Sequence, residues 1–574
     1  MRRLVVAATI GVMLASGCRR APPAPVVPDE WTLRSIRVDT AAGAMISSND
    51  SLATLAGLEI LERGGNAVDA AVAVGFALAV TYPEAGNIGG GGFTLIRLAD
   101  GRTAAIDYRE TAPLAATRDM YVDSAGNVTD QSRIGHLASG VPGTVAGLSA
   151  ILERYGTMKL ADVMRPAIRL ASEGFVVDSA LARSLVGGQA RITMYDGAAL
   201  FFPNGTALAR GTRLVQPDLA RTLRAIAAAG PAPFYTGEIA DSVVAEMRRG
   251  GGLITREDLA RYAPAWREPL RGTYRGYTLL TMPPSSSGGT TLLETLNVLE
   301  ALGPLPSFGS TAYAHRVSEA LRRSFLDRND QLGDPAFVDN PVARLTSKEY
   351  AAALARSIDP ARASQSLALA QSRTEGTETT HYSIVDRAGN AVATTYTIND
   401  LWGSGVWVRG AGFFLNDEMD DFAARPGQPN LFGLVQGERN AIVPGKRMLS
   451  SMTPTIVVDS SGATFLIVGS RGGPRIITST MLAISNVIDH RMSLADAVAA
   501  PRIHHQALPD SLRYEANGLR PAVVDSLRAM GHAVGVATWQ PGGYSGRVHA
   551  IMKTPAGWVG VVDPRTSGLA KGID

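Results

Sequence analysis

A segment dense in hydroxyl side chains, between residues 374 and 399, constrains this chain more than any other feature. Residues 381–385 alternate polar and apolar side chains, residues 386–390 form a turn-like run, and residues 391–398 are rich in Val, Thr and Tyr. This pattern predicts a β-hairpin. The Thr and Ser residues of the segment are Thr374, Thr377, Thr379, Thr380, Ser383, Thr394, Thr395 and Thr397.

Two interpretations of these hydroxyls remain open from the residues alone. Threonine suits a half-buried pleated strand, so the segment is compatible with an ordinary Thr-rich strand pair. Alternatively, one Thr at a strand start is a nucleophile. A Thr hydroxyl is a weak nucleophile unless a base lies beside it, and one available base is the α-amine of the same Thr, freed by cleavage of the chain.

A family resemblance favours the second interpretation. The relevant runs are Thr379-Thr-His-Tyr-Ser383, Gly389-Asn-Ala-Val392 and Thr395-Tyr-Thr-Ile-Asn399. They resemble the start of the small subunit of the gamma-glutamyltransferases, which are N-terminal-nucleophile hydrolases that cut their own precursor to expose a catalytic Thr. The resemblance implies that Glu378–Thr379 is the self-cleavage bond, that Thr379 is the nucleophile, and that Thr397 is the neighbouring hydroxyl that orients it.

The resemblance runs in order through nearly the whole chain, from about Val38 onward. It implies an α+β fold, a four-layer αββα sandwich of two antiparallel sheets flanked by helices, which composition could not have revealed. It also implies a large subunit of residues 38–378 and a small subunit of residues 379–574 that remain together as a heterodimer. The length of 574 residues allows three or four domains, or one large α/β unit.

Composition describes a globular chain without a strong charge bias. Hydrophobic residues make up 45% and charged residues 19%, which is enough apolar material for a large core. The 55 Lys and Arg residues nearly balance the 52 Asp and Glu residues. Composition therefore gives no case for binding nucleic acid or an anionic membrane surface.

Residues 1–18 predict a lipoprotein-type signal peptide. Arg2 and Arg3 form a charged start, and residues 4–14 are apolar but too short to span a bilayer. Residues 15–18, Ala-Ser-Gly-Cys, resemble a bacterial lipobox, and Cys18 is the single cysteine of the chain. We therefore expect an exported protein, periplasmic or in the cell envelope, lipid-anchored through Cys18 by a tether of residues 19–37. An ordinary secretory signal with an incidental Cys is the alternative.

Helical spacing of apolar residues predicts a helix over residues 51–63, which the Gly64-Gly65 pair ends. Residues 67–80, preceded by a capping Asn66, are apolar nearly all round and predict a deeply buried helix. The glycine run 87–92 leads into an apolar strand and not a helix, which argues against a phosphate-binding loop.

Arg109 follows a predicted strand, and taken alone it would be a surface or ion-paired Arg. The resemblance implies that it binds the α-carboxylate of a glutamyl substrate, for which a planar guanidinium is well suited. Ser450 and Ser451 would donate to the same carboxylate.

The acidic run between Asp417 and Asp421 lacks the spacing of a calcium loop, so we predict no metal there. The resemblance implies instead that Glu418 and Asp421, assisted by Asn399, hold the ammonium group of the substrate. It also implies a lid over the pocket in residues 425–444. Phe432 stands where some bacterial members have a Tyr, and it lacks the hydroxyl whose hydrogen bond locks the lid in those members.

Gly472 and Gly473 follow a strong strand, and their adjacent N–H groups predict an oxyanion hole for acyl transfer. The paired His504 and His505 have no third ligand spaced near them, so we interpret them as structural. We predict no cofactor and no metal.

The function implied is gamma-glutamyl transfer from glutathione-like donors to water, an amino acid or a peptide. One alternative is a glutaryl-cephalosporin acylase or another amidase on the same scaffold, whose substrates lack the ammonium group. A second alternative is a lipoprotein that binds peptides and has lost self-processing.

Overall fold

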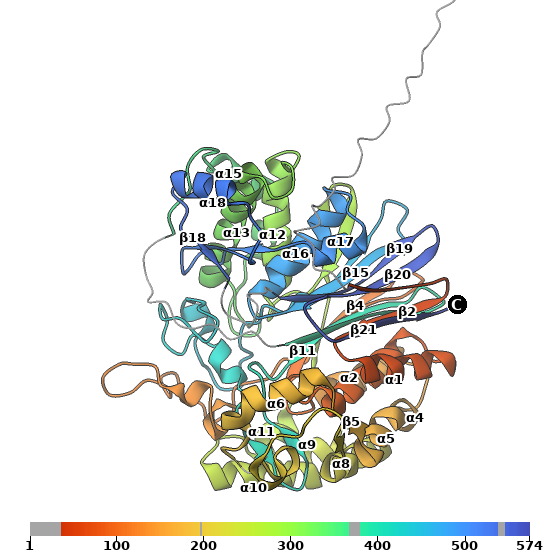
Figure 1. Ribbon diagram of the computed structural model, residues 1–574. Helices are drawn as coiled ribbons and strands as arrows, with labels where there is room; N and C mark the ends of the chain where they lie inside the picture. Colours follow the sequence, from red (N-terminus) through yellow and green to blue (C-terminus); the bar gives the residue numbers. More distant parts are fainter. Residues whose placement is uncertain (1–35, 196–197, 367–378, 538–545) are drawn as a thin grey trace, which may run out of the picture.

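A computed structural model describes residues 36–195, 198–366, 379–537 and 546–574. Within these residues two seven-stranded sheets stack face to face, and helices cover the outer face of each (Figure 1). All strand pairs in both sheets are antiparallel. The predicted four-layer αββα sandwich is therefore confirmed.

The first sheet contains the predicted hairpin at its centre. Its strands, in spatial order, are β21 (Leu569–Ile573), β2 (Ala44–Ser48), β10 (Thr380–Val385), β11 (Ala391–Thr397), β3 (Gly91–Arg97), β4 (Thr103–Asp107) and β7 (Ala265–Arg267). The hairpin register pairs Thr380 with Tyr396 and Val385 with Ala391. Strands from distant parts of the sequence flank the hairpin, β2 beside β10 and β3 beside β11.

The second sheet has strands from both ends and the middle of the chain. In spatial order they are β1 (Arg37–Ala41), β20 (Gly557–Val562), β19 (Arg547–Thr554), β15 (Thr464–Arg471), β14 (Thr455–Val458), β9 (Tyr277–Thr281) and β8 (Leu270–Tyr274). Strands β10 and β11 pack against β15 of this sheet. Small and medium apolar side chains, among them Leu95, Ala393 and Ile467, fill the space between the sheets.

The two faces of the hairpin have different surroundings. On the outer face, the Tyr382 and Tyr396 hydroxyls donate to backbone oxygens of α2 (Ala67–Thr81), to Ala71 at 3.0 Å and Gly75 at 2.9 Å. On the inner face, the His381 ring lies against Gly469 of β15, where an added Cβ would come 2.2 Å from the ring. The alternation expected of a strand therefore directs residues 379, 381 and 383 into the space between the sheets.

Helices α1 (Ser51–Glu62) and α2, both predicted from the sequence as helices, cover the first sheet. Every residue of α2 is buried, in agreement with its apolar composition on all sides. Asn66 caps this helix in a capping box with Asp69, which satisfies backbone donors of its first turn. The second sheet is covered by α12 (Gly288–Ala301), α16 (Arg475–Ile488) and α17 (Leu494–Ala499), and α13 (Thr311–Gln331) packs against α12.

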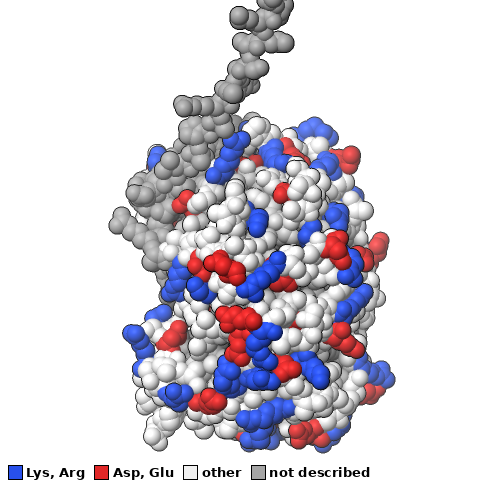
Figure 2. Space-filling view, turned by 90° about the vertical axis from the view of Figure 1, so that its right-hand side faces the viewer, with Lys and Arg blue, Asp and Glu red and all other residues white. Residues whose placement is uncertain are grey.

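Further helices extend the molecule at both ends (Figure 1). Beyond the first sheet lie α3 (Thr144–Tyr155), α5 (Arg165–Glu173), α6 (Ser179–Ile192), α8 (Pro217–Ala229), α10 (Glu238–Gly250) and α11 (Arg256–Arg261). Beyond the second sheet lie α15 (Lys348–Arg356) and α18 (Pro521–Ala529). None of the described helices combines the length and apolar character needed to cross a bilayer. On the face shown in Figure 2, acidic and basic side chains are intermingled, which agrees with the balanced composition.

Substitution of Gly469 tests the packing of the two sheets. Gly469→Ala would drive a methyl group into the His381 ring, which hydrogen bonds hold to Thr395 and Ser383. We expect a loss of about 1–3 kcal/mol in stability, measured as a lower thermal unfolding temperature. Gly187 of α6 provides the control, because an added Cβ there meets nothing within 4 Å. Gly187→Ala should be neutral or slightly stabilising, and equal losses in both variants would contradict the packing argument.

Candidate active site

Thr379 lies immediately before β10, and Thr397 is the last residue of β11. The hairpin register continues from Thr380 opposite Tyr396, so residues 379 and 397 are opposite each other. Both are nearly buried, with 4% and 3% of their surface exposed. The Thr397 hydroxyl accepts a hydrogen bond from the Asn399 backbone N–H at 2.8 Å. Glu378, on the other side of the predicted cleavage bond, lies outside the described residues.

Two other hydroxyls of the hairpin contact the His381 ring. The His381 Nδ1 atom lies 2.7 Å from Thr395 Oγ1, and its Nε2 atom lies 3.1 Å from Ser383 Oγ. Burial holds the pKa of His381 well below its usual value, so the ring is neutral. Part of the hydroxyl density in the sequence is thus explained by a buried, neutral histidine, and the ordinary structural interpretation holds for these two residues.

Gly472 and Gly473 form the turn between β15 and α16. Their φ angles are +122° and +57°, a region that favours glycine. A Cβ at position 473 would also come 2.5 Å from the Phe432 ring. Both glycines are therefore required by conformation or space, and they stand at the positive end of the α16 dipole, where negative charge is stabilised.

Phe432 lies in a tight turn of residues 430–434. The Asn430 side chain accepts the backbone N–H groups of Phe432 at 3.0 Å and Leu434 at 3.1 Å. The Leu431 N–H donates to Asp420 Oδ2 at 2.8 Å, and the Gln506 side chain donates to the Phe432 carbonyl at 3.0 Å. The predicted lid residue is thus held over Gly473 by ring contact and by hydrogen bonds to its backbone. That this segment acts as a lid stays a prediction.

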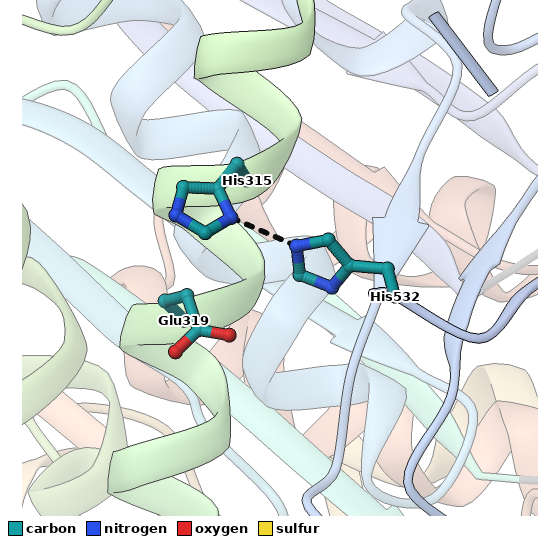
Figure 3. Close-up of side chains that lie close together, drawn as sticks. All are labelled: His315, Glu319 and His532. Carbon is teal, nitrogen blue, oxygen red and sulfur yellow. Dashed lines mark hydrogen bonds between the residues drawn. The ribbon is translucent and has the colours of Figure 1, made fainter. Parts of the chain in front are cut away.

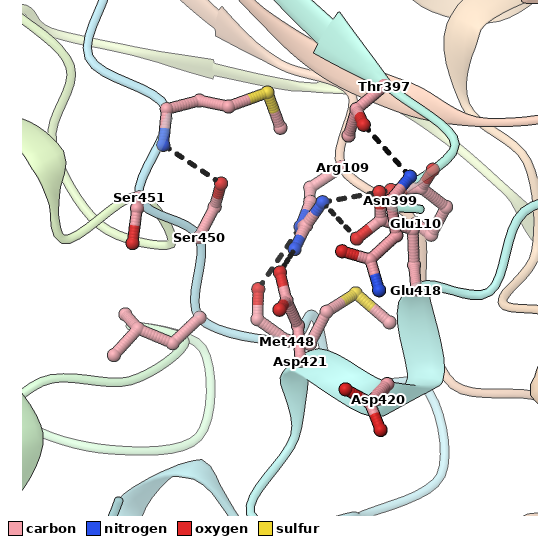
Figure 4. A network of polar contacts seen from close by, with 12 residues as sticks. Arg109, Glu110, Thr397, Asn399, Glu418, Asp420, Asp421, Met448, Ser450 and Ser451 are labelled. Carbon is pink, nitrogen blue, oxygen red and sulfur yellow. Dashed lines mark hydrogen bonds and ion pairs between the residues drawn. The ribbon is translucent and has the colours of Figure 1, made fainter. Parts of the chain in front are cut away.

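Arg109 is the centre of a buried ionic cluster (Figure 4). Its side chain is 1% exposed. Its Nη1 atom lies 2.5 Å from Glu418 Oε2 and 3.6 Å from Glu110, and its Nη2 atom pairs with Asp421 Oδ2. Its Nε atom donates to the Met448 carbonyl at 3.4 Å. The family resemblance implies that Arg109 binds one end of the substrate and the two acids bind the other, whereas in the structure Arg109 contacts both acids directly.

The carboxyl groups of this cluster outnumber Arg109, and this imbalance affects their protonation. Burial raises the pKa of Glu110 to about 8, against the opposing effect of Arg109. Burial also raises the pKa of Asp421 and Glu418, again opposed by Arg109, and the neighbouring acids add to the increase. An incoming positive charge would therefore be favoured beside these acids.

The remaining predicted residues lie around this cluster. The Asn399 side chain donates to the Asp417 carbonyl at 3.0 Å, which joins the end of β11 to the acidic turn η5 (Glu418–Asp421). Ser450 and Ser451 lie on one side of Arg109, and Asn399 and Glu418 lie on the other (Figure 4). The Ser450 hydroxyl accepts the Met452 N–H at 3.1 Å. The structure thus brings Arg109, both serines, Asn399 and the two acids together.

Two charged residues of this region were not predicted from the sequence. Glu110 follows Arg109 directly, and the charged end of that strand was the only signal. Arg328 of α13 donates to Ser451 Oγ at 3.2 Å. It lies far from Ser451 in the sequence, within an ordinary helical pattern, so no local signal could have revealed it.

A histidine and glutamate cluster lies apart from this site, between α13 and the turn after α18 (Figure 3). His315, Glu319 and His532 place one ligand atom each within 4.8 Å of one another. However, His315 Nδ1 lies 2.8 Å from His532 Nε2, and Glu319 is paired with Arg322 at 3.2 Å and Arg323 at 2.7 Å. The positive charges of these two arginines would repel a divalent cation. We therefore interpret the cluster as a structural polar contact between α13 and the turn after α18.

His504 and His505 also have structural contacts. His504 Nδ1 lies 2.8 Å from Thr478 Oγ1, and its Nε2 lies 2.9 Å from Gln506 Oε1. His505 Nε2 lies 3.3 Å from Asp510. These contacts explain the positions of the two rings, and they agree with the structural role predicted for them.

Comparison with known proteins places the chain in a family. The sequence profile described as Gamma-glutamyltranspeptidase matches residues 53–573. The chain is 46% identical to the "Glutathione hydrolase proenzyme" of Escherichia coli (strain K12), over 99% of this chain and 98% of that protein. It is 40% identical to the "Acylase ACY 1 proenzyme" of Pseudomonas sp. (strain V22), over 86% and 88% of the two chains.

Solved structures agree with this placement. The cephalosporin acylase from Bacillus halodurans superposes with a TM-score of 0.81 at 27% identity, covering 96% of this chain and 99% of that one. The profile match over most of the chain and the identity to the Escherichia coli protein carry the conclusion: the chain belongs to the gamma-glutamyltranspeptidase family, within the N-terminal-nucleophile hydrolases.

Proposed function

We propose that this protein is a self-processing gamma-glutamyltransferase and glutathione hydrolase. The observation that carries the proposal is the buried pairing of Arg109 with Glu418 and Asp421, close to the serine pair. These groups match the two charges of an α-amino acid, a carboxylate and an ammonium. A substrate with a single charge would leave either the arginine and serine groups or the two acids without a partner.

In the proposed mechanism, cleavage at Glu378–Thr379 frees the α-amine of Thr379. This amine takes the proton of the Thr379 hydroxyl as its oxygen attacks the γ-carbonyl of the donor. The N–H groups of Gly472 and Gly473 stabilise the oxyanion. The C–N bond then breaks, the amine leaves with the proton, and a γ-glutamyl ester remains on Thr379. Water or the amino group of an acceptor resolves the ester.

Donor binding would rearrange the ionic cluster. The donor carboxylate would accept from Arg109, Ser450 and Ser451, and its ammonium would bind Asp421 and Glu418, with Asn399 assisting. The zwitterionic donor would insert between Arg109 and the two acids. Each ion pair of Arg109 with an acid would then be replaced by an ion pair with the donor. A charge buried without such a partner would be costly.

The acylase alternative has one supporting fact, the 40% identity to a protein named as an acylase. A glutaryl group carries no ammonium, so such a substrate would bring no positive charge to Asp421 and Glu418. The presence of both acids favours gamma-glutamyl donors. A protein that only binds peptides would not need the threonine pair or the glycine turn.

Self-processing is tested first with Thr379→Ala. We expect the wild-type protein to separate on denaturation into two chains, the smaller beginning at Thr379, because this residue is both nucleophile and new N-terminus. Thr379→Ala should remain one inactive chain by intact mass. Thr380→Val is the control, since alternation directs Thr380 to the opposite face of the strand, and it should still be cut. Efficient cutting of Thr379→Ala would refute the assignment.

Donor specificity is tested with Asp421→Asn. Loss of one partner of a buried charge pair costs roughly 3–5 kcal/mol, so kcat/KM for γ-glutamyl anilide should fall about 100- to 5,000-fold. Glutaryl anilide, which has no ammonium, should be affected far less. Asp420→Asn is the control, because Asp420 binds Ser132 and the Leu431 N–H instead of Arg109. Equal losses on both anilides in Asp421→Asn would return support to the acylase alternative.

We also propose that the protein is exported and anchored by lipid at Cys18, which lies outside the described residues. The supporting features are the short apolar segment and the single cysteine that follows it. Cys18→Ser should abolish labelling by a fatty-acid probe and release the protein from the membrane fraction. Equal labelling of both proteins would remove the anchor from the proposal and leave an ordinary secretory signal.

A further inference from the structure

Arg328 of α13 is a buried cation surrounded by neutral acceptors. Its side chain is fully buried, and it donates to Ser287 Oγ at 2.9 Å, Asn329 Oδ1 at 2.9 Å, Gln436 Oε1 at 3.3 Å and Ser451 Oγ at 3.2 Å. Among the residues that the structure describes, no carboxylate lies within ion-pairing distance of it. A buried charge without a counter-ion is costly, so its retention calls for an explanation.

The charge of Arg328 persists at neutral pH. Burial lowers its pKa to about 10, and the nearby Asp421 opposes this decrease. Asp421 therefore interacts electrostatically with Arg328, although its ion pair is with Arg109. Arg328 thus contributes positive potential to the same region as the ionic cluster, which contains more carboxyl groups than cations.

The hydrogen bond to Ser451 has a definite direction. A guanidinium can only donate, so the Ser451 oxygen is the acceptor and its own O–H remains to donate elsewhere. The Ser450 hydroxyl oxygen likewise accepts a hydrogen bond, from the Met452 N–H, so its own O–H also remains to donate elsewhere. Arg328 also fixes Ser287, whose backbone N–H and hydroxyl donate to the Ser450 carbonyl at 2.8 and 2.6 Å. One guanidinium therefore orients both serines.

We propose that Arg328 is a positioning residue of the carboxylate subsite, which directs the Ser451 proton at the donor carboxylate and supplies a second buried positive charge there. This inference rests on the proposed function. It explains why the subsite could attract a carboxylate at all, since the charge of Arg109 is already engaged by Glu418 and Asp421. It also assigns a partner to Arg328, namely the substrate.

The test uses three matched anilides that differ only in charge. γ-Glutamyl anilide has a carboxylate and an ammonium, glutaryl anilide has only the carboxylate, and 4-aminobutanoyl anilide has only the ammonium. Arg328→Gln should lower kcat/KM for the first two by about 10- to 100-fold, the loss typical of one contact to a charged group. The third should be unchanged. Arg328→Lys should recover part of the loss because it keeps the charge.

Inhibition repeats the comparison without turnover. In Arg328→Gln, the Ki values of L-glutamate and glutarate against γ-glutamyl anilide should rise by a similar factor, and that of 4-aminobutyrate should not. Arg322→Gln is the control, because Arg322 is a buried arginine of the same helix that pairs with Glu319 and Asp510. Its effect should not depend on the charge of the ligand. All variants are first confirmed as self-cleaved.

The outcomes separate this inference from the proposed function. Equal losses on all three anilides, or equal changes in the three Ki values, would show that Arg328 has only a structural role and would overturn the inference. A wild-type protein that turns over glutaryl anilide as well as γ-glutamyl anilide would instead contradict the proposed function.

Discussion

The close stacking of the two sheets determines where chemistry can occur in this molecule. β10 passes over β15 at Gly469, where the absence of a side chain admits the His381 ring. The start of β10 and the end of β15 then lie on facing layers of the sandwich. Thr379, the proposed nucleophile, directly precedes the first strand, and Gly472, of the proposed oxyanion hole, directly follows the second. Groups held at the ends of rigid strands retain their relative position better than groups on long loops.

The second organising feature is the electrostatic asymmetry of the cluster around Arg109. Three carboxyl groups and one guanidinium are buried together, an arrangement that burial alone would penalise. The raised pKa of Glu110 shows one response, in which the acid keeps its proton. A ligand with both charges offers another, because it can separate the groups and give each a partner. Selectivity would then follow from the number of charges on the ligand as much as from its shape.

Local patterns predicted much of the fold, and distant pairings escaped them. The alternation in residues 381–398 predicted the hairpin, and the apolar residues 67–80 predicted the buried helix α2. The layer order and the candidate site residues followed only from the family resemblance. The direct contact of Arg109 with Glu418 and Asp421 was not foreseen, because these residues are far apart in the sequence. For the same reason neither the Arg328–Ser451 contact nor the approach of Phe432 to Gly473 could be read from the residues.

The order of strands in the first sheet has a consequence for assembly. From one edge it reads β21, β2, β10, β11, β3, so β2, from before residue 379, lies between β21 and β10, which both come from after it. Cutting the chain at that point would leave two polypeptides whose backbones are hydrogen-bonded to each other along several strands. They could part only by dismantling the sheet, and after dissociation each would lack its neighbours. The two polypeptides would thus reach this fold only as one covalent precursor. After cleavage, the native state would persist because it unfolds slowly, and not because the separated chains could reassemble.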